Sequence, residues 1–110
     1  MFEKNLEIAF LLDFYGDVLS DRKKSVLDDY YNNDLSLSEI AQELGISRQG
    51  VRELIKKAEE ELNFYEQKLH LAQRFGEAGE HAAALRALAV EHKLPDEVIS
   101  EIRALEACIS

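Results

Sequence analysis

The sequence predicts an all-α protein built around a helix-turn-helix, with a long second helix and a small helical tail towards the C-terminus. Two observations predict this fold class. Apolar residues recur at helical spacing along most of the 110 residues, and no segment alternates with the two-residue period of a strand. In addition, residues 35–62 carry the start, stop and cap signals of two helices joined by a tight turn.

The N-terminal part of the chain predicts two helices in front of this unit. Apolar residues at helical spacing indicate a helix over residues 3–16, which Gly16 ends. Ser20 is a candidate N-cap for a second helix from about Asp21 to Asn32. Four aromatic residues at helical spacing are expected in the core or against a partner helix, rather than as platforms for stacking bases. They are Phe14, Tyr15, Tyr30 and Tyr31.

The first helix of the helix-turn-helix is predicted to begin at a capping box and to end at a glycine. Ser36 lies three residues before Glu39, so each side chain can accept the backbone amide of the other residue. Gly45 suits the left-handed position that follows a helix, and Ser47 can cap the next helix. The small Ala41 permits the two helices to cross closely. Two ordinary bundle helices joined by a short loop are the alternative interpretation.

The second helix of this pair is predicted to be long. Apolar residues continue as a heptad seam to about Phe75, and Gly76 and Gly79 are expected to mark the helix end. Such a seam must be covered by later helices of the chain or by a second copy of it. The sequence therefore predicts a dimer or packing seam. Its residues are Ala58, Leu62, Tyr65, Leu69 and Ala72.

The domain prediction follows from this long helix. Residues 1–62 are expected to form a four-helix segment that contains the helix-turn-helix at 36–57. Residues 63–110 would hold the end of the long helix and two C-terminal helices, packed as one continuous unit or as a dimer. These last helices are predicted from about Glu80 to His92 and from Pro95 to Cys108.

The charge of the chain limits where nucleic acid could bind. A formal net charge of −9 has the wrong sign for a protein whose whole surface binds phosphate. The charge is unevenly distributed, however. Residues 46–75 carry six basic and five acidic residues, against four and ten before them and three and seven after them. Only the middle of the chain is positive, so any phosphate-binding surface is expected there.

This positive stretch supplies the candidate nucleic-acid-binding residues. Arginine and glutamine at the start of such a helix are the residue types that read guanine and adenine edges, and lysines one turn later would lie over phosphates. The alternative is a solvated helix face whose lysines pair with Glu53, Glu60 and Glu61 at i, i+4 spacing. The candidates are Ser47, Arg48, Gln49, Arg52, Lys56 and Lys57.

Signals for catalysis are weak, and we expect a protein that is not an enzyme and needs no cofactor. His70, His81 and His92 have no partner at the spacing of a known metal site, so no metal site is predicted. The single cysteine, Cys108, excludes an intrachain disulfide and suits a reducing cytoplasm. No signal peptide or membrane-spanning run is recognised. We therefore expect a cytoplasmic protein with no membrane partner and no small-molecule substrate.

Several motifs together resemble one family of small bacterial proteins. The motifs are SLSEIA at 36–41, SRQ at 47–49, Val51, residues 55–57 and YEQKLH at 65–70, with LLDFYGDVLSDRKKSVLDDYYNNDLSL at 11–37 resembling the first two helices of that family. The family is the YlxM family, whose helix-turn-helix is similar to region four of sigma factors. The resemblance covers about residues 5–75. Relatives are expected to carry alanine at Gly50 and an aromatic at Arg52, so Arg48 and Gln49 are the firmer candidates for reading bases.

This resemblance implies a cytoplasmic regulatory or accessory protein linked to the signal recognition particle pathway. The link is inferred for the family from gene proximity to the particle's GTPase, and it implies no reaction. Our favoured hypothesis is an accessory factor whose cationic residues bind the particle's RNA or an acidic protein surface, so the expected partners are nucleic acid (RNA or DNA), the particle's GTPase, or both. Two rivals stay open: a dimeric transcription regulator that binds a DNA major groove, and a helical adaptor that binds protein through aromatic residues.

Overall fold

The structure is a computed structural model that describes residues 6–109. Residues 1–5 and 110, and with them the predicted start of the first helix at residue 3, lie outside the described residues. The part that is described is helical with connecting turns and holds no strand, which confirms the predicted all-α class. The chain forms two compact units, Met1–His70 and Leu71–Ser110. The division falls at residue 70, later than the boundary at 62 that the sequence suggested.

The first unit contains the helix-turn-helix and the helices that support it. Its elements are α1 (Leu6–Tyr15), a 3₁₀ turn (Gly16–Val18), α2 (Asp21–Leu27), a π-helical turn (Asp28–Asn32), α3 (Leu37–Leu44) and α4 (Arg48–Leu69). Ser20 caps α2 as predicted, because its Oγ accepts the amide of Lys23 at 3.3 Å. The second predicted helix is present, but its last turn is π-helical, with the Asn33 amide bonded to the Asp28 carbonyl five residues back.

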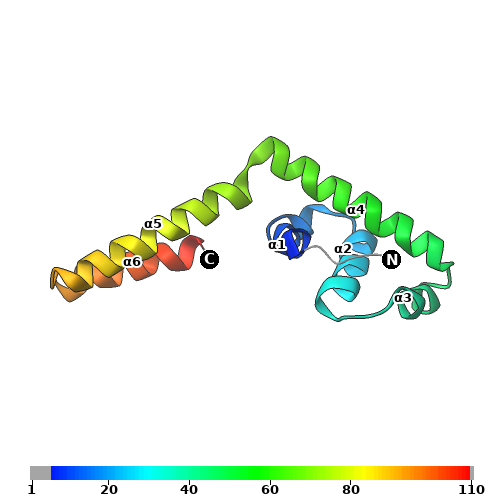
Figure 1. The fold of residues 1–110 in the computed structure, drawn as a ribbon, viewed down its shortest axis with the longest axis horizontal. Coiled ribbons are helices and arrows are strands. Elements are labelled where there is room, and N and C mark those ends of the chain that lie inside the picture. The colour runs from blue at the N-terminus through cyan, green and yellow to red at the C-terminus, as the bar shows by residue number, and fades with distance from the viewer. Residues whose placement is uncertain (1–5, 110) are drawn as a thin grey trace. The chain divides into compact units, whose positions relative to one another are not determined.

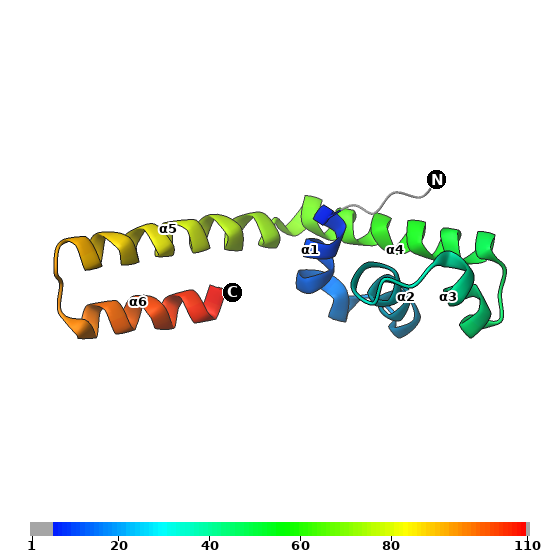
Figure 2. The same ribbon diagram turned by 60° about the horizontal axis from the view of Figure 1, so that its bottom comes forward.

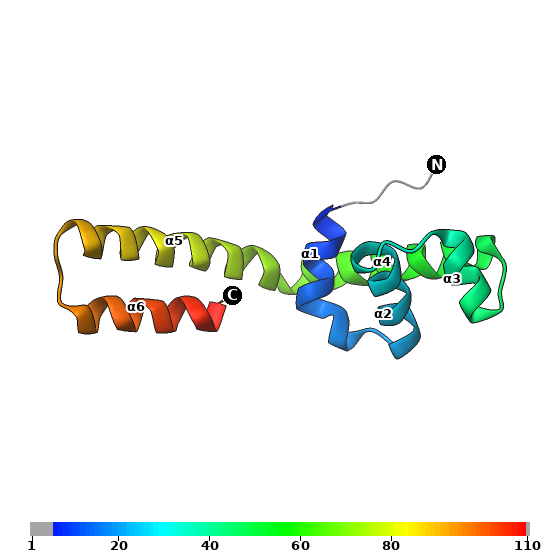
Figure 3. The same cartoon turned by 90° about the horizontal axis from the view of Figure 1, so that it is seen from below.

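Helix α4 is the element against which the rest of the first unit packs. Helices α1, α2 and α3 all contact it (Figure 1), and seen from below they lie along its length (Figure 3). One stripe of α4 is fully buried by these contacts, with spacings of four and three residues that keep it on one side of the helix. The stripe consists of Val51, Ile55, Ala58 and Leu62.

The aromatic residues of α1 and of the π-helical turn belong to this packing. Tyr15 and Tyr30 are buried, and Phe14 and Tyr31 are half-buried, so these rings are part of the core and its edge, as predicted. The Tyr15 ring lies 5.9 Å from the ring of Tyr65 on α4, measured between centroids. This distance is in the range of favourable aromatic pairs, so the contact helps to hold α1 against α4.

The predicted end of the long helix is wrong. Helix α4 ends at Leu69, because His70 adopts a left-handed backbone conformation with a φ of 55°. The chain then enters α5 (Leu71–Glu91), and Gly76 and Gly79 lie inside that helix instead of marking an end. Sequence rules place a left-handed cap at glycine and treat glycine as a helix breaker, and here the chain departs from both tendencies.

The second unit is a hairpin of two antiparallel helices, α5 and α6 (Asp96–Ile109), which lie side by side in Figure 2. Ala82 and Ala89 of α5 and Ile102 of α6 are buried. The small alanines allow the two helix axes to come close. Across the hairpin the Nε of Arg86 donates a hydrogen bond of 2.7 Å to Oε1 of Glu106.

Candidate nucleic-acid interface

The turn between α3 and α4 follows the predicted cap signals closely. Ser36 and Glu39 form both bonds of the capping box, each at 3.1 Å from donor nitrogen to acceptor oxygen. Gly45 has a φ of 68°, and its amide and that of Ile46 both bond to the Ala41 carbonyl. Ser47 then starts α4 by accepting the Gly50 amide at 3.0 Å. Local sequence therefore specifies where α4 begins and how sharply the chain turns into it.

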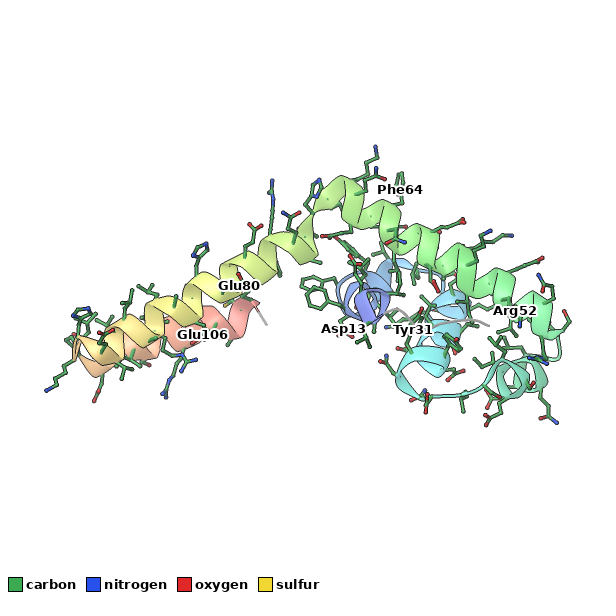
Figure 4. The ribbon with its side chains drawn as sticks, viewed as in Figure 1. Asp13, Tyr31, Arg52, Phe64, Glu80 and Glu106 are labelled. Atoms are coloured by element: carbon green, nitrogen blue, oxygen red, sulfur yellow. The ribbon has the colours of Figure 1, made fainter. Side chains whose placement is uncertain are left out.

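The buried stripe of α4 decides which of its side chains meet solvent. Since the stripe is turned towards α1, α2 and α3, the opposite side of the helix is free of them. Figure 4 shows Phe64 directed away from α1 and α2 on that side. We call this surface the α4 outer face. Its exposed residues are Gln49, Glu53, Lys56, Lys57, Glu60, Asn63, Phe64, Gln67 and Lys68, and we include Arg48, which is exposed in the first turn of α4 although it lies three residues before Val51 on the line of the stripe.

Four of the six predicted nucleic-acid-binding residues lie on the α4 outer face. Arg48, Gln49, Lys56 and Lys57 are exposed, and none of the three cations among them forms an ion pair with another described residue. The described part of the chain neither covers this cationic group nor neutralises it by direct pairing. About two and a half turns of helix, from Arg48 to Lys57, therefore present three positive charges that are unpaired among the described residues.

The other two predicted residues have partly structural roles. Ser47 is exposed, but its Oγ serves as the N-cap acceptor of α4, which leaves the hydroxyl proton and one lone pair for a ligand. Arg52 is half-buried, and its Nε is inaccessible to solvent without a hydrogen-bond partner among the described residues. Arg52 is consequently the weakest of the arginine candidates for contact with a base.

Several acidic residues of α4 are engaged within the unit. Oε1 of Glu59 accepts a hydrogen bond of 3.0 Å from the Tyr31 hydroxyl, and Oε1 of Glu66 accepts one of 2.6 Å from the Tyr15 hydroxyl. Glu61 pairs with Lys23 of α2 at 3.2 Å. The predicted alternative, in which Lys57 pairs with Glu61 one turn along α4, is therefore not formed. These contacts draw carboxylates towards the core side and leave the cations outside.

Burial has an electrostatic effect on one of these carboxylates. Partial removal from water raises the pKa of Glu59 above its usual range, because a charged carboxylate loses hydration there. The hydrogen bond from the Tyr31 hydroxyl acts in the opposite direction, since it favours the charged form, and it is the smaller effect. The charged form of Glu59 is therefore disfavoured by the fold on the inner side of α4.

The α4 outer face also carries two carboxylates. Glu53 is one turn from both Gln49 and Lys57, and Glu60 is one turn from Lys56. Neither carboxylate forms an ion pair with another described residue. They reduce the positive potential over the lysines, so this face is suited to a selective contact with few phosphates rather than to strong general binding of nucleic acid.

Sequence reasoning overlooked Phe64, which extends this face towards the end of α4. Its side chain is 55% exposed, and the Lys68 Nζ lies 5.8 Å from the centre of its ring. That distance is within the range of a cation–π interaction. The signal was available, because Phe64 falls outside the heptad seam and lies one heptad after Lys57 on the same side of the helix.

The structure divides the predicted seam. Ala58 and Leu62 are fully buried inside the first unit, and Tyr65 is half-buried beside Tyr15. Leu69 is 50% exposed, and Ala72 belongs to α5 because the helix breaks at His70. The first half of the seam is therefore packing within one chain. Ala72 is itself buried and Leu69 is exposed, so a dimer through Leu69 stays a prediction.

Two further observations concern the residues that the structure describes. No group of three or more histidine, cysteine or acidic side chains is arranged to hold a metal ion there. None of the described helices combines the length and the apolar character required to cross a bilayer.

The fold and the α4 outer face together define a helix-turn-helix protein with an appended helical hairpin. Residues 2–102 match the family described as "Putative helix-turn-helix protein, YlxM / p13 like". The chain belongs to this YlxM family. The match extends well past residue 75, where the resemblance of the quoted motifs ended, so most of the C-terminal tail belongs to the family pattern as well.

Individual relatives agree with this assignment. The chain is 41% identical over 104 residues to the UPF0122 protein YlxM of Bacillus subtilis (strain 168), and these residues cover 94% of each of the two chains. It is 39% identical over 102 residues to UPF0122 proteins of Bacillus cereus (strain AH187) and Bacillus anthracis (strain A0248), with 93% of each chain covered.

Proposed function

We propose that the protein is a regulatory or accessory protein of the bacterial signal recognition particle pathway that binds nucleic acid through the α4 outer face. The pathway follows from the expectation attached to the YlxM family. The binding mode is supported by one observation above all: Arg48, Lys56 and Lys57 are exposed and form no ion pair with another described residue, on a molecule of net charge −9. Cations without an ion-pair partner among the described residues are available to a ligand.

The particle's RNA is the target that this charge distribution supports best. An acidic molecule is repelled by long stretches of duplex backbone, but one short cationic segment can still meet a few phosphates of a folded RNA. Gln49 at the start of α4 adds a side chain that can donate to and accept from a base edge. The contact would be weak in free energy and selective, because indiscriminate binding is opposed by the rest of the surface.

A transcription regulator is the second candidate, and one specific observation favours it. The sharp turn at Gly45 presents the start of α4 with Arg48 and Gln49 exposed, which is how helix-turn-helix proteins present base-reading side chains to a DNA major groove. Such a function would require a dimer to supply two half-sites. The third candidate function is that of a helical adaptor that binds the particle's GTPase, and the same test can identify it.

The test compares three fluorescently labelled ligands: the particle's RNA, random duplex DNA and the isolated particle GTPase. Each is titrated with the full chain at two salt concentrations. Arg48→Glu is the informative variant, and Arg103→Glu on α6 is its matched control, because it makes the same change of charge at an exposed site in the other unit. Circular dichroism confirms that both variants remain folded.

RNA-selective binding that is lost in Arg48→Glu and kept in Arg103→Glu is the expected result. Tight binding to duplex DNA with a sequence preference and a steep salt dependence would replace the proposal with the transcription-regulator function. Binding to the GTPase alone, indifferent to Arg48→Glu, would replace it with the adaptor function. Equal losses in both variants would mean that net charge, and not the α4 outer face, controls binding.

A further inference from the structure

The α5–α6 hairpin leaves several large apolar side chains in solvent. Leu85, Leu88 and Leu105 are each about half exposed, and Val98 is 36% exposed. Much of what the hairpin buries is small, since two of its buried side chains are Ala82 and Ala89. Two helices can cover only one side of each other, so a hairpin with further leucines on a second side is suited to receiving another element.

These four exposed residues lie on the same side of the hairpin. At about 100° of turn per residue, Leu85 and Leu88 lie anticlockwise of the buried line through Ala82 and Ala89, viewed from the start of α5. The same construction places Val98 and Leu105 anticlockwise of buried Ile102, viewed from the start of α6. Because the two helices are antiparallel (Figure 2), both anticlockwise flanks face the same way.

The register of the hairpin brings the four residues close to one another. Arg86 bonds to Glu106, and a Cβ placed on Gly79 would lie 3.7 Å from Ile109, so α5 and α6 run past each other with these pairs at the same level. Leu85 is then level with Leu105. We call this apolar surface the hairpin face, defined by Leu85, Leu88, Val98 and Leu105.

The edge of the hairpin face is acidic. Glu97 and Glu101 are exposed and share the flank of α6 that carries Val98 and Leu105. The basic residues of the unit lie elsewhere or are engaged. Arg86 is bonded to Glu106, Arg103 lies on the other flank of α6, Lys93 is in the connecting loop, and Arg74 precedes the part of α5 that α6 covers.

We propose that the hairpin face binds a cationic amphipathic helix of another protein. Leucines at i, i+3 and i+7 spacing would be received between α5 and α6, and lysines or arginines beside them would lie over Glu97 and Glu101. A second copy of the hairpin fits less well, because a two-fold interface would gather the carboxylates of both copies at one site. The 14 residues of α6 span about 21 Å, which matches an incoming helix of about four turns.

The hairpin face shares no residue with the α4 outer face, so this proposal can be tested independently of the proposed nucleic-acid binding. The probe is a labelled synthetic helix of about 18 residues with leucines along one side and lysines beside them. A second peptide carries glutamate in place of each lysine. Fluorescence anisotropy measures the affinity of both peptides for the full chain. Leu85→Ser and Leu105→Ser remove the hairpin face, and Val90→Ser is the control, since Val90 is 58% exposed on the opposite flank of α5.

We expect the lysine peptide to bind at least about tenfold more tightly than the glutamate peptide, and each leucine variant to weaken it by about tenfold. Val90→Ser should leave its affinity unchanged. Glu97→Gln combined with Glu101→Gln should weaken it several-fold and reduce its salt dependence. Circular dichroism checks that each variant keeps its helical content.

Equal affinity of the chain for the two peptides would overturn the proposal. A loss of affinity in Val90→Ser as large as that in Leu85→Ser and Leu105→Ser would also overturn it. Sedimentation equilibrium provides a second check. A dimer that dissociates in Leu105→Ser but not in the glutamate-to-glutamine variant would show that a second copy covers the hairpin face, and would also overturn it.

Discussion

Two leucines one heptad apart on α4 allow a sharp test of how the long helix is covered. Leu62 is fully buried and Leu69 is 50% exposed. Replacing either with alanine removes the same atoms from the same helix, so the two variants differ mainly in environment. Leu62→Ala leaves a cavity among packed side chains, which costs about 2.7–5 kcal/mol of the free energy of unfolding in comparable cores. Leu69→Ala opens no enclosed cavity in the monomer and should cost less than about 1 kcal/mol.

The size of the Leu62 effect makes the measurement straightforward. A loss of about 3 kcal/mol is a large share of the roughly 5–15 kcal/mol that stabilises a domain, and it should lower the melting temperature by more than about 10 °C. Urea unfolding followed by circular dichroism gives the free energy of each variant. Nearly equal losses for Leu62→Ala and Leu69→Ala would refute our reasoning, because Leu69 would then have to be covered in solution. If that cover were a second copy, the melting temperature would also rise with protein concentration.

The remaining predictions concern single sites. Gly76→Ala should raise the free energy of unfolding by about 0.5–1 kcal/mol, because Gly76 is helical and has open space where a Cβ would be. Gly45→Ala should lower the free energy of unfolding by about 1 kcal/mol, because Gly45 has a left-handed backbone conformation. Thermal melts in which both variants shift the melting temperature in the same direction would contradict this. Lys57→Ala should make the salt slope of nucleic-acid binding shallower by about 0.7–0.9 if Lys57 meets one phosphate, and an unchanged slope in anisotropy titrations would exclude that contact. Glu59→Gln should stabilise the protein at pH 7 more than at pH 4. The raised pKa of Glu59 means that its charged form is unfavourable in the fold, and this penalty disappears as the pH falls through that pKa; urea midpoints that show no difference between the two pH values would argue against it.

The helix-turn-helix could be predicted closely because its signals are local. Ser36, Glu39, Gly45 and Ser47 act on backbone groups within a few residues of themselves, and each does in the structure what its chemistry predicts. The core side of α4 could also be predicted, because the spacing of Val51, Ile55, Ala58 and Leu62 selects one side of a helix whatever packs against it.

The end of α4 could not be predicted in the same way. The seam of apolar residues continues through His70, and only the backbone shows that this histidine takes the left-handed conformation that a glycine would adopt more readily. Gly76 and Gly79 are tolerated inside α5, although each weakens a helix by about 1 kcal/mol relative to alanine. Such outcomes depend on the surrounding structure, which outweighs propensities of this size.

The residues of the candidate site could be predicted from the sequence, but whether their side chains are open to a ligand could not. Sequence placed Arg48, Gln49, Lys56 and Lys57 near Glu53, Glu60 and Glu61, and pairing within the helix was as reasonable as exposure to a ligand. The structure shows Glu61 paired with Lys23 of another helix, and Arg48, Lys56 and Lys57 without an ion-pair partner among the described residues. Phe64 was overlooked because a phenylalanine in a helix is more often buried than exposed.

By itself, the sequence determined the all-helical class, the cap residues of the sharp turn and the side of α4 that must be buried, because these depend on spacing and on bonds between near neighbours. Only the tertiary structure decided where the long helix stops, which carboxylates of α4 are drawn to Tyr15, Lys23 and Tyr31, and which cations are left in solvent. Those outcomes join residues that are distant in the chain, and the distances between such residues are set by how whole helices pack.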